Sequence, residues 1–334
     1  MNRPPLLRQL SDLSARLGKD SSLVQGAGGN TSIKQGQTLW IKASGKWLSA
    51  AEDEDVFIGL DLAGVRARIA AGRGDDLAGT IIGAPSQMRP SIETTLHALL
   101  PHAVVLHVHS VRTIALAVLR DAQIVFGERL AGLRWTFVPY HRPGLPLTAA
   151  VQSRLDHDSI DVLVLGNHGL VVGGANCREA EALLNEVERR LEGPLRHRVL
   201  PDLEGLRRLG AEINYRLPRY DEAHNLAGHP GATAIVAAGS LYPDHVVFLG
   251  PAVAVLERYG GALKFSRPGA AVAVVPGQGT LVRNDLSAGA EEMVRALGRV
   301  IARIPDGADV LYLSKTEEDE LFAWEAEKYR RSFS

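Results

Sequence analysis

The stretch VVLHVHSV, residues 104–111, places two histidines in a run of valine and leucine that is typical of a buried strand. Side chains two positions apart on a strand point to the same face, so His107 and His109 are expected side by side. Imidazoles are costly to bury without partners. The two rings therefore share either a hydrogen-bonding pocket in the core or a metal ion.

A metal centre needs a further ligand, because catalytic zinc sites usually use three protein side chains and leave one position open. His168 in GNHG (166–169) is the third candidate, since it lies at a turn between two apolar runs with a glycine on both sides. His97 and His102 are weaker candidates, because they fall in or just after a helix expected over 90–101. On the residues alone, hydrogen-bonded core histidines and a solvated turn histidine stay open as the alternative.

A carboxylate accompanies the histidines. Glu93 lies fourteen residues before His107, near the start of the helix expected over 90–101, where Pro90 and Ser91 are plausible start signals. A carboxylate beside a Lewis acid is the usual equipment for moving a proton next to a carbonyl. This neighbourhood favours the metal interpretation.

Two glycine-containing stretches have the composition of an anion cradle. GAGGNTS (26–32) offers backbone N–H groups and polar side chains, and SGK (44–46) offers a hydroxyl, N–H groups and a lysine. Ser91 lies near a helix start, where N–H groups favour an anion. The spacings of a Walker loop and of a dinucleotide fingerprint are both absent. Ordinary turns have a similar composition, so both interpretations stay open here.

Around these motifs, apolar periodicity predicts alternating helices and strands. We expect helices over 5–17, 90–101, 111–119, 177–193 and 287–304, and strands over 38–45, 104–111, 134–140, 160–174 (two), 245–250 and 270–282. Residues 26–34 are expected to form a loop and residues 194–230 a connecting segment. Residues 316–333 predict a charged helix with Leu321 and Trp324 on its apolar face.

A shift of 110 residues aligns residues 162–191 with residues 272–301 without a gap, with seven identities in thirty positions. A degenerate repeat and convergence of two strand–turn–strand–helix units explain this similarity equally well. Gln278 takes the place of His168, and a neutral amide is a poor zinc ligand, so no second metal site is expected. His245 in YPDH is the one residue of this part considered able to reach the substrate.

The length, net charge and cysteine content of the chain limit the class of protein it can belong to. The 334 residues suggest one large domain or two ordinary ones, and the net charge of -1 speaks against nucleic-acid and membrane partners. The single cysteine, Cys177, excludes an intrachain disulfide and suits a reducing compartment. The N-terminus is too polar for a signal peptide, and no apolar run approaches the ~20 residues of a membrane span. We therefore expect a cytoplasmic protein.

Five motifs together resemble one family. GGNTS, ASG, PSIETTLH, HVHS and GNHGLVVGG occur in the order and spacing of the class II aldolase/adducin family, which includes sugar-phosphate aldolases and an epimerase. The resemblance covers about residues 8–195. The longer members, related to the aldolase half of bifunctional rhamnulose-phosphate aldolase/dehydrogenase proteins, are also similar in YPDHVVFLG and in a WEAEKYR ending.

The resemblance implies an α/β fold: a three-layer α/β/α domain with a mostly antiparallel central sheet over 1–200, and a smaller C-terminal α/β module over 201–334. It implies one divalent metal per chain, usually Zn²⁺, held by His107, His109 and His168. It implies that Glu93 is the catalytic acid/base. It also implies that the substrate phosphate contacts Gly29, Asn30, Ser44, Gly45 and Ser91.

The implied function is that of a lyase, a class II aldolase that cleaves a C–C bond of a small carbohydrate through a metal-stabilised enediolate, as a homo-oligomer (tetramer or dimer). Relatives with the same centre decarboxylate, dehydrate or epimerise, and a non-catalytic adducin-like scaffold is a second alternative. All three histidines and Glu93 are present, which argues against the scaffold.

Two departures from the family pattern matter. Ile92 stands where the phosphosugar aldolases have a second polar residue, which leaves open whether the substrate is phosphorylated. The proton-donating tyrosine of those aldolases has no residue-by-residue match, and Tyr140 and His141 are nearby candidates only.

Overall fold

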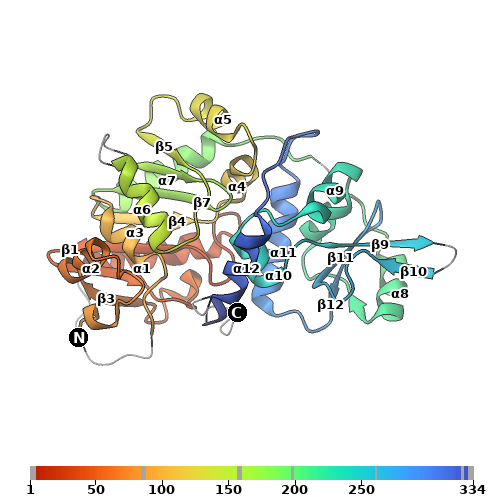
Figure 1. Ribbon diagram of the computed structural model, residues 1–334, viewed down its shortest axis with the longest axis horizontal. Helices are drawn as coiled ribbons and strands as arrows, with labels where there is room; N and C mark the ends of the chain where they lie inside the picture. The colour runs from red at the N-terminus through yellow and green to blue at the C-terminus, as the bar shows by residue number, and fades with distance from the viewer. Residues whose placement is uncertain are drawn as a thin grey trace.

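Two β-sheets organise this chain, a larger one from its N-terminal part and a smaller one from its C-terminal part (Figure 1). The computed structural model describes residues 5–83, 88–155, 160–196, 199–259, 262–324 and 327–329. In Figure 1 the two sheets lie at opposite ends of the molecule, with helices α10 (Pro243–Leu249) and α11 (Ala288–Ile301) between them. This placement puts C-terminal elements next to the N-terminal sheet.

The larger sheet has seven strands in the order β3-β2-β1-β4-β7-β6-β5, and every pairing except the parallel β5–β6 pair is antiparallel. The mostly antiparallel sheet expected for this domain is confirmed. Its strands are β1 (Asn30–Gln35), β2 (Thr38–Lys42), β3 (Phe57–Asp61), β4 (Val104–Val108), β5 (Trp135–Val138), β6 (Val162–Leu165) and β7 (Gly169–Gly174).

Helices cover both faces of this sheet, which gives three layers. Along β4, Val104 and Val108 pack with residues of α1, α4 and α7, whereas Val105 packs with residues of α3 and α6 on the other face. This alternation is the two-residue period of a strand buried on both sides. The helices of this part are α1 (Pro5–Lys19), α2 (Leu62–Ala70), α3 (Thr94–Leu99), α4 (Val111–Ala117), α5 (Ala122–Arg129), α6 (Leu145–Leu155) and α7 (Cys177–Arg190), with short 3₁₀ turns η1 (Leu48–Ala50) and η2 (Ala78–Thr80).

The smaller sheet has five strands in the order β10-β9-β11-β12-β8, which confirms an α/β architecture for the C-terminal part. Its strands are β8 (Tyr215–Arg216), β9 (Ala254–Tyr259), β10 (Ala262–Phe265), β11 (Val272–Val275) and β12 (Gly279–Arg283). Besides α10 and α11, the helical elements here are α8 (Leu203–Ile213), η3 (Asp221–Ala227), α9 (Pro230–Ala238) and α12 (Lys315–Ala323). One apolar cluster extends from Leu13 of α1 through Ile114 of α4 to Val294 of α11, so both parts share a core.

The 110-residue shift relates these two sheets in connectivity as well as in sequence. Arg216 of β8 pairs with Val282 of β12, as Leu106 of β4 pairs with Val172 of β7 at the same offset. Strand β9 runs parallel to β11, just as β5 runs parallel to β6, although at the 110-residue offset β5 corresponds to helix α10 and not to β9. Element η3 also follows α4 at this offset. The similarity therefore extends beyond the aligned thirty residues, which favours the repeat over convergence.

Two sequence expectations for the C-terminal part are wrong. Residues 194–230 are not a simple connection, because they contain α8, β8 and η3. Residues 245–249 belong to helix α10 rather than to a strand, and Gly250 follows its end. Its residues are almost all buried, so its apolar run lacks the polar face that identifies a helix in a sequence. Helix α10 begins at Pro243 and stops at Gly250, whose φ of 80° suits glycine.

Three boundaries also differ from expectation. Residues 30–34 form strand β1 and not a loop, and α3 covers only Thr94–Leu99 of the helix expected over 90–101. Helix α12 ends at Ala323 because Trp324 has extended backbone, so Trp324 does not share a helical face with Leu321; part of the expected helix lies outside the described residues.

No single described helix is long and apolar enough to cross a membrane. Helices α9 and α10 are so only when taken together, and they form a pair bent by 80°.

Candidate metal centre and active site

Three histidines converge at one edge of the larger sheet. His107 lies on β4, His109 directly follows the end of β4, and His168 lies in the turn between β6 and β7. All three are buried, and one ring nitrogen of each lies within 4.8 Å of the others. The ring centroids are 4.9 to 5.3 Å apart. Among the described residues no other group of metal-ligating side chains converges in this way.

Hydrogen bonds orient two of the three rings. The Nδ1–H of His107 donates to the carbonyl of Leu170 at 3.1 Å, and the Nδ1–H of His109 donates to Oδ2 of Asp244 at 2.7 Å. Each Nε2 atom is then a proton-free acceptor, and these two atoms lie 3.1 Å apart. Two facing lone pairs repel unless a cation lies between them, so the donor set fits a divalent metal.

Burial keeps the imidazoles in the form that binds metal. It lowers the pKa of His107, although nearby Glu93 acts in the opposite direction. It also lowers the pKa of His168 to about 3, again against the effect of Glu93. Both rings are therefore neutral at pH 7, and a neutral imidazole nitrogen is the metal-binding form.

Glu93 lies beside the histidines at the N-cap of α3. Its Oε2 is 3.2 Å from Nε2 of His107, and its Oε1 is 3.6 Å from Nε2 of His168. Nδ2 of Asn30 donates to Oε2 at 2.8 Å, because the β1–β4 register places Asn30 opposite His107. Burial raises the pKa of Glu93, whereas the hydrogen bond from Asn30 lowers it. A cation held by the three neutral histidines would lower it further, so the carboxyl is ionised beside such a cation.

A single cavity brings the predicted substrate-binding residues to this centre. It is narrow, with a volume of about 20 Å³, and Glu93, His109 and His168 contribute to its lining. All five residues predicted to bind substrate also line it: Gly29, Asn30, Ser44, Gly45 and Ser91.

Three charged residues of this cavity were missed by the sequence analysis. Lys42 of β2 lines it and donates from Nζ to the carbonyl of Ala27 at 2.7 Å. Asp244 of α10 and Glu327 near the C-terminus also line it, although both are far from the family motifs in sequence. The signals that could have found them are the YPDH and WEAEKYR segments, which were noted without a role for either acid.

The weaker candidates lie elsewhere. His245 does not line the cavity; its Nδ1 accepts a hydrogen bond from the N–H of Leu241 at 3.3 Å. Tyr140 and His141 do not line it either. His97 Nδ1 pairs with Ser32 Oγ at 2.7 Å, and His102 Nε2 pairs with Asp161 Oδ1 at 2.8 Å. These contacts give His97 and His102 structural partners.

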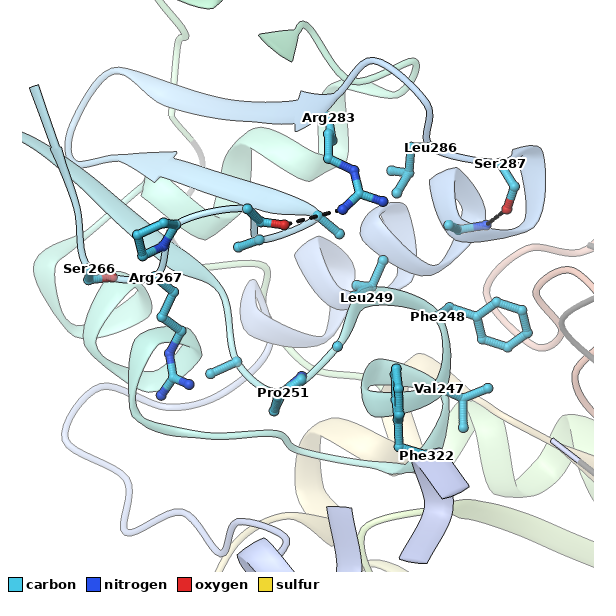
Figure 2. Close-up of a pocket in the computed structure, with 17 residues that line it drawn as sticks. Val247, Phe248, Leu249, Pro251, Ser266, Arg267, Arg283, Leu286, Ser287 and Phe322 are labelled. Carbon is cyan, nitrogen blue, oxygen red and sulfur yellow. Dashed lines mark hydrogen bonds between the residues drawn. The ribbon is translucent and has the colours of Figure 1, made fainter. Parts of the chain in front are cut away.

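A larger hollow of about 730 Å³ lies on the C-terminal part and shares no lining residue with the histidine cavity. Figure 2 shows Val247, Phe248 and Leu249 of α10 along one side of it, with Phe322 of α12 nearby. Its two arginines do not converge, because Arg283 donates to the carbonyl of Gly269 while Arg267 points away (Figure 2). The hollow therefore lacks a cluster of reactive groups.

Comparison with known proteins gives one family match. Residues 8–193 match the model of the class II aldolase and adducin N-terminal domain. A curated relative, an uncharacterized oxidoreductase (YuxG) of Bacillus subtilis strain 168, is 27% identical over 286 residues. That match covers 73% of this chain but 41% of the relative, so the chain spans about two fifths of the relative's length.

Solved structures that are similar to this chain cover a smaller share of it than the curated relative does. The N-terminal class II aldolase domain of a conserved Thermoplasma acidophilum protein is 27% identical, with a TM-score of 0.48, over 55% of this chain and 90% of that one. An L-fuculose 1-phosphate aldolase is 20% identical, with a TM-score of 0.42, over 64% of this chain and 97% of that one.

Proposed function

Because this chain belongs to the class II aldolase and adducin family, we propose that it is a metal-dependent lyase that cleaves a carbon–carbon bond of a sugar-derived hydroxy-carbonyl compound. The observation that carries the proposal is the convergence of three buried histidines with the Glu93 carboxylate, beside a cavity that Glu93, His109 and His168 line. Burying such a cluster costs free energy, and clusters of this kind concentrate at functional sites. A non-catalytic scaffold gains nothing from it.

His107, His109 and His168 would hold the cation, and three imidazoles suit Zn²⁺. When bound, such a cation acts as a Lewis acid that polarises a carbonyl oxygen and stabilises the negative charge that develops there. The contribution of the protein is to present three neutral imidazoles already oriented toward one point.

Glu93 is the residue proposed to move the proton. Its carboxylate is ionised, so it accepts the proton of the substrate hydroxyl as the adjacent C–C bond breaks, and it then gives a proton to the carbon atom that keeps the bonding electrons; in the reverse direction it removes that proton from carbon. The 2.8 Å bond from Asn30 fixes Oε2, which leaves Oε1 as the oxygen without a hydrogen-bond partner in the described structure. A fixed base reduces the entropy lost on reaching the transition state.

The loops around Gly29, Ser44 and Ser91 are proposed to hold the remote end of the substrate. The carboxylate of Glu327 lines the same cavity, and the side chain of Ile92 adds no hydroxyl. A phosphate dianion beside a carboxylate is disfavoured, whereas sugar hydroxyls donate to it readily. These features support a substrate whose remote end is hydroxylated and not phosphorylated.

The test is product analysis by NMR with the metal-loaded full chain. Paired substrates, each ketose or hydroxy-keto acid with and without a terminal phosphate, are incubated with enzyme. We expect two carbonyl fragments from the unphosphorylated members, and loss of this activity with a chelator. Release of CO₂, loss of water or epimerisation without fragmentation would identify a different reaction at the same centre. A protein that binds no metal and turns over none of these compounds would instead be a scaffold.

A further inference from the structure

We propose that Asp244, in the C-terminal part of the chain, is a positioning residue of the metal centre, which orients His109 and strengthens the hold of the three histidines on a divalent cation. The inference rests on the proposed function only in treating these histidines as ligands. Asp244 lies outside residues 8–193, the part that matches the family model. The C-terminal part would thus complete a site that the N-terminal domain alone leaves unsupported.

The contact between Asp244 and His109 is short, and both side chains are buried. Oδ2 of Asp244 lies 2.7 Å from Nδ1 of His109, and the two side chains are 2% and 6% exposed. A carboxylate at this position fixes the proton on Nδ1 and directs Nε2 toward the other two histidines. It also makes the ring a stronger electron donor. The carboxylate lies on the Nδ1 side of the ring, so it supports the ligand and does not replace it.

The loop before β1 is shaped around this contact. A Cβ atom added at Gly28 would lie 2.9 Å from the carbonyl oxygen of Gln25, 3.0 Å from Nδ1 of His109 and 3.1 Å from Oδ2 of Asp244. All three separations are tighter than ordinary carbon contacts, so a side chain here would press against this hydrogen bond as well as against its own loop. The loop at Gly28, the end of β4 and helix α10 are far apart in sequence, yet they pack closely around one hydrogen bond. Such close packing is typical of a well-ordered protein interior.

The same C-terminal segment also braces the turn that carries His168. Nδ2 of Asn167 donates to the carbonyls of Leu241 at 2.9 Å and Leu311 at 2.8 Å. Leu241 lies three residues before Asp244, and α10 packs between α11 and α12. Two of the three ligand positions are thus held by C-terminal groups, whereas His107 is held by its own sheet through Leu170.

The experiment measures metal binding by the full chain, so it needs no substrate. Zinc affinity is measured by competition with a chromogenic chelator, and Co²⁺ absorption reports ligand geometry. Asp244→Asn keeps the size of the side chain and removes its charge. We expect it to bind zinc about 10- to 100-fold more weakly, with a changed Co²⁺ spectrum, as for other groups that support metal ligands. Gly28→Ala should weaken binding in the same direction.

The matched control is Tyr242→Phe, two residues from Asp244. The Tyr242 hydroxyl is buried and has no hydrogen-bond partner in the described structure, so its loss should leave zinc affinity and the Co²⁺ spectrum unchanged. Wild-type affinity and spectrum in Asp244→Asn would overturn the inference. If that variant does not fold, wild-type affinity in Gly28→Ala overturns it. Wild-type binding by His109→Ala would instead contradict the metal centre, and with it the proposed function.

Discussion

At the scale of the residue, Glu93 has the environment of a catalytic group and not that of a stabilising one. Its side chain is buried among imidazoles and accepts only one described hydrogen bond from a neutral donor, Asn30. No lysine or arginine pairs with it among the described residues. A carboxylate held in this way is poised to exchange a proton.

Replacing Glu93 by Gln is expected to lower the turnover rate by ~10²–10⁴-fold, the usual contribution of a general acid or base. The size of the side chain is kept, so zinc content should be unchanged. Steady-state kinetics and metal analysis of the pure variant check this. Glu188→Gln, which alters a buried carboxylate outside the cavity, is the control. Unimpaired turnover by Glu93→Gln would remove Glu93 from the mechanism.

Glu327 makes a separate prediction about substrate charge. Glu327→Gln removes a negative charge from the cavity lining, so phosphorylated substrate analogues should bind about tenfold more tightly as competitive inhibitors. Glu320→Gln, on the exposed side of α12, is the control and should leave inhibition unchanged. If Glu327→Gln changes the affinity for phosphorylated inhibitors no more than Glu320→Gln does, Glu327 does not face the remote end of the substrate.

Some residues of the metal centre could be predicted from the sequence, and others could not. His107, His109, His168 and Glu93 lie in short motifs whose chemistry is visible in the sequence. Asp244 could not be found in this way, because its contact with His109 joins positions 135 residues apart. The neighbouring His245 was the residue expected to reach the substrate, but its Nδ1 accepts a hydrogen bond from the N–H of Leu241 outside the cavity.

At the scale of the element, the β6–β7 turn is the most constrained part of the site. Asn167 has a φ of 51°, in the left-handed region, and its side chain satisfies two C-terminal carbonyls. Asparagine tolerates this backbone better than most residues and supplies the donors as well. Asn167 therefore positions His168 both through its left-handed backbone and through the hydrogen bonds of its side chain.

Asn167→Ala should lower the free energy of unfolding by about 2–3 kcal/mol, because it strains the backbone and leaves buried carbonyls without a donor. Asn167→Gly relieves the backbone strain and isolates the loss of the donors, so it should cost about 1 kcal/mol less. Urea unfolding of both variants measures this difference. Equal stability of the two variants would contradict the role given to the backbone at this turn.

Elements differed in how well their sequences revealed them. The β6–β7 and β11–β12 hairpins and their helices were predicted, because they combine apolar runs, a turn and an amphipathic helix. Helix α10 was not predicted because burial on nearly all sides removes the periodic signal. Helix α8 was missed although Leu203, Leu206 and Leu209 have helical spacing.

At the scale of the whole molecule, buried neutral histidines make stability depend on pH. Burial lowers the pKa of His97 to about 3 and that of His245 to about 4. Between these values and the ordinary value of 6.5, the unfolded chain binds protons that the folded chain does not. Their contribution to stability is therefore full above pH 6.5 and is lost as the pH falls toward 4.

We expect the metal-free protein to unfold at lower urea concentration at pH 5 than at pH 7. Each such histidine contributes a slope of up to about 1.4 kcal/mol per pH unit in this window. His245→Asn should have a shallower slope than the wild type. A wild-type slope in His245→Asn would show that its burial is not what couples stability to pH.

The relation between the two sheets bears on the number of metal sites. At the 110-residue offset, His107, His109 and His168 correspond to Leu217, Arg219 and Gln278. None of these three is a good zinc ligand. The C-terminal part therefore shares the strand connectivity of the site without its donors, and it contributes supporting groups such as Asp244 instead.

Zinc titration of the metal-free full chain, with bound metal quantified after dialysis, tests the three-histidine centre most directly. We predict one ion per chain for the wild type and for Gln278→Ala. Little bound metal is expected for His107→Ala, His109→Ala or His168→Ala, because two imidazoles cannot complete the site. Full occupancy in His107→Ala and His168→Ala, or two ions per chain with the second lost in Gln278→Ala, would contradict the account.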